Sequence, residues 1–272
     1  MVKFFKFCLP LLILGCFTGC RIDVLGLVGS TDLATRLEER DNFRFLTDSD
    51  RTLSLGEEYS FIVLNDIHIK NGNIWGLEKL KTVIDENSEI KFAIIAGDIT
   101  DFGAAQDIEK FVSFARTLGI PCYPVIGNHD IFFGNWTQWK NRIGSTRYRI
   151  DGDGTALFIL DSANAFFGKD QFDWIERELK TTEGRVFVFS HTNLFVESLK
   201  DVEQFADTKE RARIVSILRN RCDIMFMGHV HKRIIKETGN VKYITIEDYR
   251  TNRIYCLVSV EKSGVSYKFE KL

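Results

Sequence analysis

All five histidines of the chain lie in short polar segments that directly follow apolar runs. The segments are Asn65-Asp66-Ile67-His68, Gly127-Asn128-His129-Asp130, Ser190-His191 and Gly228-His229-Val230-His231, and Gly97-Asp98 follows another apolar run in the same way. Imidazole nitrogens suit Fe, Zn and Mn in proteins, and carboxylate and amide oxygens suit harder ions. The residue types therefore indicate metal chemistry.

A structural role explains such a set of side chains poorly. One histidine after one strand is more often a packing or surface residue. Five imidazoles gathered with several carboxylates would cost desolvation and mutual repulsion, and a metal cation relieves both. None of these segments contains a cysteine, which excludes a structural zinc knuckle.

The elements that must position these residues are predicted from the apolar pattern. Runs at 61–64, 92–96 and 123–126 predict strands, and helical spacing over 74–84 and 108–118 predicts the helices between them. Two further strands are predicted at 186–189 and 224–227. In open α/β sheets ligands bind outside the carboxyl ends of the strands, so all five polar segments are expected at one edge.

The rest of the chain predicts a hairpin over 148–160 and helices around 172–179 and 214–218. Turn residues at 238–240 and 262–264 then separate segments of alternating apolar and polar residues near the C-terminus. We expect antiparallel strands there, closing a second sheet.

In order and spacing, the polar segments resemble the motifs of calcineurin-like metallophosphoesterases over residues 59 to 231. The phrases at 96–101 and 125–130 look most like the branch that contains cyclic-nucleotide and glycerophosphodiester phosphodiesterases. The resemblance implies an α/β fold, a four-layer α/β/β/α sandwich of mixed sheets with the metal site at the C-terminal ends of strands. It also implies a metal-dependent phosphoric ester hydrolase, acting on diesters more than on monoesters.

The resemblance also implies roles for individual residues. One divalent ion (Mn, Fe or Zn) would take Asp66, His68, Asp98 and His231, and a second would take Asp98, Asn128, His191 and His229, with Asp98 bridging. His129 would face the substrate and stabilise phosphate charge or protonate the leaving oxygen. Asp101 matches the position whose carboxylate orients this histidine, with a helix cap as the alternative. Asp130 competes for the orienting role, although support of the loop is the favoured interpretation.

The N-terminus predicts export. Lys3 and Lys6 precede an apolar run at 7–17 that is too short to span a bilayer comfortably. A cysteine after glycine then resembles a bacterial lipoprotein cleavage box, at Cys20 or alternatively at Cys16. We expect a signal at 1–20, a tether and lead-in at 21–57, and the phosphoesterase domain at 58–272. The protein would be a membrane-anchored lipoprotein on the periplasmic or cell-surface side; a plain secretory signal or an uncleaved anchor is the alternative.

Composition limits the partners. The net charge of −2 gives no global basic field, so no nucleic acid is expected, and no protein partner is inferred. Packing is favoured for Trp136 and Trp139, and a solvated face rather than phosphodiester contact for Arg142, Arg147 and Arg149. The alternative functions are a non-catalytic metal-binding surface lipoprotein, and a phosphomonoesterase or nuclease of the same fold.

Overall fold

The computed structural model describes residues 32–195 and 207–272. Its centre is formed by two mixed sheets, each with parallel and antiparallel neighbours. In spatial order, the seven-stranded sheet contains β1 (Thr52–Leu53), β5 (Tyr148–Gly152), β6 (Thr155–Ile159), β7 (Arg185–Phe189), β8 (Ile224–Met227), β10 (Val241–Thr245) and β9 (Ile234–Thr238). The five-stranded sheet contains, likewise in spatial order, β12 (Gly264–Lys271), β11 (Ile254–Glu261), β2 (Tyr59–Leu64), β3 (Ile90–Ala96) and β4 (Cys122–Val125).

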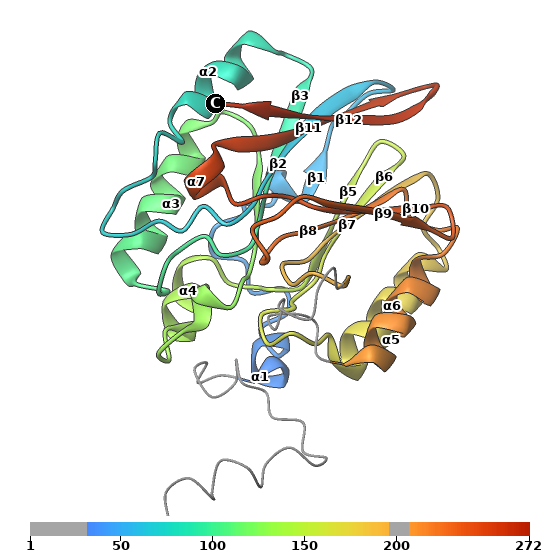
Figure 1. Ribbon diagram of the computed structural model, residues 1–272, viewed down its shortest axis with the longest axis horizontal. Helices are drawn as coiled ribbons and strands as arrows, with labels where there is room; N and C mark the ends of the chain where they lie inside the picture. The colour runs from blue at the N-terminus through green and yellow to red at the C-terminus, as the bar shows by residue number, and fades with distance from the viewer. Residues whose placement is uncertain (1–31, 196–206) are drawn as a thin grey trace, which may run out of the picture.

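Helices cover the outer face of each sheet (Figure 1). The five-stranded sheet carries α2 (Lys79–Glu86) and α3 (Ala105–Thr117), and the seven-stranded sheet carries α5 (Gly168–Leu179) and α6 (Thr208–Leu218). The result is the predicted four-layer α/β/β/α sandwich with mixed sheets.

Aromatic side chains fill the space between the two sheets. Phe61 on β2 stacks on Phe92 of β3 with ring centroids 4.7 Å apart. On the other side it meets the edge of Phe187 of β7 at 5.0 Å. Aromatic pairs of this kind contribute about 0.5–1.5 kcal/mol beyond the area they bury. All six residues of β2 are buried, because β3 and β11 flank it and the other sheet covers it.

Two predicted elements differ in detail. The helix expected from residue 74 begins at Lys79, because Trp75 and Gly76 have positive φ angles of 55° and 80° that a right-handed helix cannot contain. The C-terminal strands divide between the sheets: β9 and β10 extend the seven-stranded sheet, whereas β11 pairs antiparallel with β2 in the other.

The folded domain begins earlier than the predicted residue 58. The helix α1 (Leu33–Leu37), a 3₁₀ turn (Ser49–Arg51) and β1 all pack on the domain, and Leu33, Leu37 and Leu53 are buried. The sequence gives little sign of this, because α1 spans barely more than one turn. The predicted signal and Cys16 and Cys20 lie outside the described residues.

Two further short helices, α4 (Trp136–Arg142) and α7 (Tyr249–Asn252), and a second 3₁₀ turn (His129–Ile131) complete the described elements. Trp136 and Trp139 on α4 are buried, in agreement with the packing role favoured for them. Within residues 32–195 and 207–272, none of the helices has the length and apolar character needed to cross a bilayer.

Candidate metal centre

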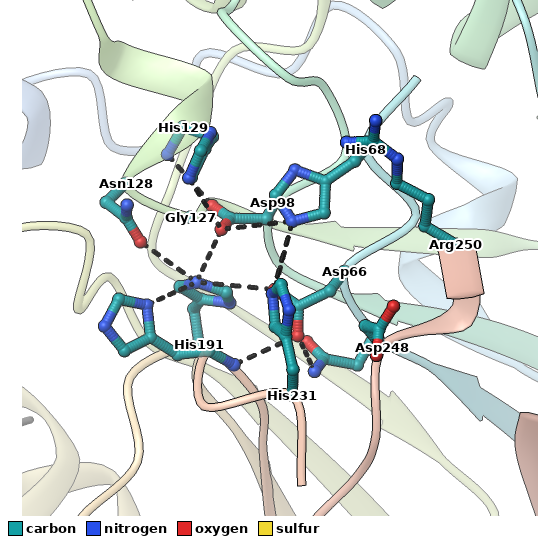
Figure 2. Close-up of polar contacts among 12 residues, drawn as sticks. Asp66, His68, Asp98, Gly127, Asn128, His129, His191, His231, Asp248 and Arg250 are labelled. Carbon is teal, nitrogen blue, oxygen red and sulfur yellow. Dashed lines mark hydrogen bonds and ion pairs between the residues drawn. The ribbon is translucent and has the colours of Figure 1, made fainter. Parts of the chain in front are cut away.

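The predicted site residues converge on the seam between the two sheets (Figure 2). Asp66 and His68 follow β2, Asp98 follows β3, and Asn128 and His129 follow β4, all strands of the five-stranded sheet. His191 follows β7, and His229 and His231 follow β8, both strands of the seven-stranded sheet. Each sheet therefore supplies part of the site from the C-terminal ends of its strands.

One group of ligand atoms surrounds the carboxylate of Asp66. Its Oδ1 atom lies 3.7 Å from Nε2 of His68 and 3.6 Å from Nε2 of His231. The two imidazole nitrogens lie 3.5 Å apart. Because these three atoms lie within 4.8 Å of one another, a single cation can contact all of them.

A second group surrounds the buried imidazole of His191. Its Nε2 atom lies 3.2 Å from Oδ2 of Asp98, 3.1 Å from Oδ1 of Asn128 and 3.2 Å from Nδ1 of His229. The Nδ1 atom of His191 donates to the carbonyl oxygen of Ala96 at 3.1 Å. That hydrogen bond leaves the Nε2 lone pair directed at the other ligand atoms.

Asp98 joins the two groups. Its Oδ2 atom lies 3.2 Å from Nε2 of His191 and 3.8 Å from Nε2 of His68. Its Oδ1 atom accepts a hydrogen bond from the backbone amide of His129 at 2.9 Å. This placement suits a carboxylate shared by two metal ions.

The chemistry of the donor set fits two divalent ions. Among the described residues, Oδ1 of Asp66 is buried and accepts no hydrogen bond, although it lies within 4 Å of Nε2 of His68, His191 and His231. A buried carboxylate oxygen without a donor is unfavourable unless a cation neutralises it. Asp66 and Asp98 supply two negative charges and the other ligands are neutral, so two divalent ions leave a positive centre that attracts an anionic phosphate.

The surrounding charges shift the pKa values of the ligands. Burial lowers the pKa of His68, and it lowers the pKa of His229 to about 4 with help from the charge of His191. Burial also opposes the charge on His191, but Asp98 and Asp66 outweigh it and raise the pKa of His191 to about 9. For Asp98 burial is likewise outweighed, here by His191 first, and its pKa is held well below the ordinary value. The two carboxylates thus favour positive charge at the position of His191.

The backbone at the ligands is unusual. Asp66, His68, Asp98, His229 and His231 all have positive φ angles, between 43° and 74°. L-residues other than glycine seldom adopt positive φ angles, and such conformations cost on the order of 1–3 kcal/mol each. Five of the seven predicted ligands therefore have sharply turned backbones, which lets adjacent segments aim side chains at one point.

Two glycines allow the ligands to approach so closely. Gly97, with φ of 98°, leaves no room for a Cβ atom, which would overlap the imidazole of His191. A Cβ atom on Gly127 would overlap the carboxylate of Asp98. Each glycine directly precedes a predicted ligand. The Gly-Asp and Gly-Asn pairs of the sequence are therefore explained by the lack of space for any larger residue before the ligand.

His129 lies at the open side of the centre, with its side chain 30% exposed and Nε2 3.9 Å from Oδ2 of Asp98. Its Nδ1 atom donates to the backbone carbonyl of Asp101 at 2.8 Å. The carboxylate of Asp101 does not orient His129 as predicted: it bonds Lys70 at 2.7 Å and Arg250 at 3.1 Å, and lies 3.5 Å from Nδ1 of His68. The bend after β3 turns the Asp101 carbonyl, rather than its side chain, toward His129.

The Asp130 carboxylate supports the loop, as favoured from the sequence. It accepts hydrogen bonds from the backbone amides of Gly127 at 3.0 Å and Thr100 at 2.8 Å, and from the Thr100 hydroxyl at 2.9 Å. It thereby ties the loop after β4 to the loop after β3.

Several residues around the centre were not predicted from the sequence. Arg250 on α7 belongs to none of the five polar segments, yet its side chain lies beside His68 (Figure 2). Phe102 and Phe133 are 41% and 71% exposed, and Phe132 packs its ring 4.4 Å from that of His129. No local signal distinguishes such aromatic residues from core residues, because only the fold shows which of them face solvent.

Comparison with known proteins places this geometry in a family. The calcineurin-like phosphoesterase profile matches residues 59–233. A probable cyclic nucleotide phosphodiesterase of Fibrobacter succinogenes is 25% identical over 169 residues, covering 58% of this chain and 64% of that protein. A 3′,5′-cyclic-nucleotide phosphodiesterase of Nostoc sp. is 22% identical over 176 residues, covering 62% of this chain and 66% of the Nostoc protein. The chain thus spans slightly less than two thirds of either relative.

Solved structures share the fold. A dimetal phosphatase from Danio rerio superposes with a TM-score of 0.63 at 13% identity, over 78% of this chain and 95% of that one. The purple acid phosphatase PPD1 from yellow lupin seeds superposes with a TM-score of 0.59 at 12% identity, over 79% of this chain and 51% of the lupin chain. With a profile match over more than half of its length and His/Asp groups that could hold metal ions, the chain belongs to the calcineurin-like phosphoesterase family.

Proposed function

We propose that the chain hydrolyses phosphodiesters at the seam between the sheets, with Mn, Fe or Zn as the resident ions. The observation that carries the proposal is the convergence of two ligand groups on one shared carboxylate, Asp98, next to the partly exposed His129. Two divalent ions held there would supply the chemistry of a water whose pKa falls from about 15.7 to about 7, and would neutralise charge on the phosphoryl oxygens.

His129 supplies the proton. Because its Nδ1–H is committed to the Asp101 carbonyl, its Nε2 atom is the one available to the substrate. In the protonated form, Nε2–H hydrogen-bonds a phosphate oxygen or the leaving oxygen as the bond to phosphorus breaks. A positioned general acid of this kind typically contributes about 10²–10⁴-fold in rate.

Diesters are favoured over monoesters by the surroundings of His129. A diester carries a second organic group, and the exposed rings of Phe102 and Phe133 lie 5.9 Å apart beside Phe132, which contacts His129. A base or other flat group can stack on such rings, typically contributing about 1–3 kcal/mol per base. Relatives described as cyclic nucleotide phosphodiesterases support cyclic nucleotides as the first substrates to test.

The proposal is tested with the metal-loaded protein on bis-p-nitrophenyl phosphate, p-nitrophenyl phosphate and cyclic nucleotides. Asp98→Asn and His129→Ala are each expected to lose at least ~100-fold in kcat. Metal analysis separates the two roles, since only Asp98→Asn should also lose metal. A wild-type protein that holds two ions but hydrolyses none of these esters would instead favour the non-catalytic metal-binding alternative.

We also propose that the protein is exported and lipidated at Cys20, or at Cys16. The support is the charged and apolar N-terminal pattern of the sequence, which precedes the described residues. Labelling of cells with a fatty-acid analogue should mark the wild type and not Cys20→Ser. Labelling lost only in Cys16→Ser would identify Cys16 as the lipidated residue. An unlabelled wild type would contradict the proposed lipid anchor.

A further inference from the structure

A basic cavity, separate from the metal centre, lies at the edge of the seven-stranded sheet. It has a volume of about 500 Å³, and none of the predicted metal ligands lines it. The lead-in segment, the start of β5 and α5 form its wall, and five arginines face it: Arg40, Arg51, Arg147, Arg149 and Arg177. Only two carboxylates, Asp41 and Asp48, share that lining.

Arg147 is the central residue of this cavity. It is only 9% exposed, and within residues 32–195 and 207–272 no carboxylate lies within 4 Å of its guanidinium. The guanidinium makes a long hydrogen bond of 3.5 Å to the carbonyl of Asp170 and lies 5.1 Å from the ring centroid of Trp174. Burial, and then the charge of Arg40, lowers the pKa of Arg147, and the more distant charges of Asp170 and Asp41 offset this only in part. A buried cation without a direct ion pair is unfavourable.

Three of the neighbouring arginines, unlike Arg147, form ion pairs with carboxylates. Arg149 pairs with Asp151 at 2.7 Å, and Arg177 pairs with Glu178 at 3.1 Å. Arg51 pairs with Asp48. Arg40 is exposed at the rim and, among the described residues, has no ion pair. The cavity thus combines three arginines fixed by carboxylates with two that lack one.

We propose that this cavity binds a phosphate-bearing anion, with the Arg147 guanidinium as its main ligand and Arg40 closing over it. A guanidinium offers parallel N–H donors that match two phosphate oxygens, and it does so best where water is largely excluded. The anion would supply the direct ion pair that Arg147 lacks. Its source is either a soluble phosphorylated molecule or the headgroup of a phospholipid, which present the same chemistry. Anion binding at this cavity is independent of the function proposed for the metal centre.

The experiment measures anion binding to the metal-loaded full chain by calorimetry, with inorganic phosphate and inorganic pyrophosphate as probes. Wild type is compared with Arg147→Met, which keeps the length and apolar stem of the side chain. The metal centre, which also attracts phosphate, is common to both proteins. Arg142→Met is the matched control, because Arg142 lies outside the cavity and pairs with Glu109 at 2.6 Å.

Arg147→Met is expected to weaken one class of phosphate site at least ~10-fold, which corresponds to about 1.4 kcal/mol, while Arg142→Met leaves it unchanged. Phosphate should also raise the Tm of the wild type more than that of Arg147→Met. Equal binding of phosphate, of pyrophosphate and of anionic vesicles by all three proteins overturns the proposal.

Two additions keep the test decisive. Arg40→Gln changes an exposed side chain and should fold normally, so its expected several-fold weakening tests the site even if Arg147→Met does not fold. Vesicles of phosphatidylcholine with or without phosphatidylglycerol identify the source of the anion. Binding of free phosphate points to a soluble ligand, and Arg147-dependent binding to anionic vesicles alone points to a headgroup; binding to neither probe overturns the proposal.

Discussion

At the scale of single residues, the metal centre depends on backbone conformations that residues other than glycine seldom adopt. Asp66, His68 and Asp98 keep positive φ angles although each carries a Cβ atom. Such conformations persist only where the surroundings fix them. Backbone hydrogen bonds do so at this site: the Asp66 amide bonds the Gly97 carbonyl at 3.2 Å, and the His68 amide bonds the Asp98 carbonyl at 3.0 Å. The ligands are thus positioned before metal arrives.

Gly127→Ala should therefore damage the centre without touching a ligand. The added methyl group would overlap the Asp98 carboxylate and displace it. We expect metal affinity to fall at least ~10-fold, as for other residues that position ligands. Competition with a fluorescent chelator gives the affinity. Gly56→Ala is the control for backbone strain away from the centre, because its methyl group meets open space although its φ is 74°. Equal affinity in both variants would argue against close packing at Asp98.

Metal binding should depend steeply on pH. The pKa of His191 is raised to about 9 in the metal-free protein, so below that pH a metal ion must displace its proton. Affinity should rise ~tenfold per pH unit up to about 9 and then level off. Calorimetry in buffers of different ionisation enthalpy should show about one proton released per molecule at pH 7. A pH-independent affinity between 6 and 8 would show that His191 is already neutral.

At the residue scale, the sequence predicted which side chains meet but not how each is oriented. His, Asp and Asn after apolar strands are conspicuous, because they interrupt runs of residues that would otherwise be core. The partners of Asp101 could not be predicted, since Arg250 lies 149 positions away in the chain. The same holds for Arg147, whose burial depends on where the lead-in segment packs.

At the scale of elements, the short helix α1 is attached by one buried ion pair. Arg36 donates through Nε to Asp161 at 2.7 Å, and both side chains are fully buried. A helix of five residues has almost no stability of its own, so tertiary contacts must hold it. This explains why α1, α4 and α7 were not predicted, whereas the longer helices α3 and α5 were.

Arg36→Ala should destabilise the protein by about 3–5 kcal/mol, because it leaves the Asp161 carboxylate buried without its partner. Urea unfolding measures the change. Arg36→Met combined with Asp161→Leu should recover most of the loss, since it removes both charges together. If the double variant were as unstable as the single one, packing rather than charge would hold α1.

At the scale of the whole molecule, the metal centre joins the two sheets. The ion predicted at Asp66 and His68 also takes His231, and the ion predicted at Asn128 also takes His191 and His229. With these ligands, each ion would be bound from both sheets and would connect them.

Removal of metal should consequently lower the stability of the entire domain. At a free metal concentration of ~1,000 times Kd, binding adds about 4 kcal/mol, so chelation should lower Tm by roughly 8–15 °C. Calorimetric scans with and without chelator measure this. The loss should be small in Asp98→Asn, which cannot bind both ions, and an equal loss there would mean that the chelator acts elsewhere.

The position of β2 has a consequence for synthesis of the chain. This wholly buried strand lies between β3, which is made soon after it, and β11, which is made much later. Until the ribosome releases the C-terminal hairpin, one side of β2 is an unprotected, strongly apolar edge of the kind that pairs with other chains. Shortened products that lack β11 and β12 should therefore accumulate as insoluble material.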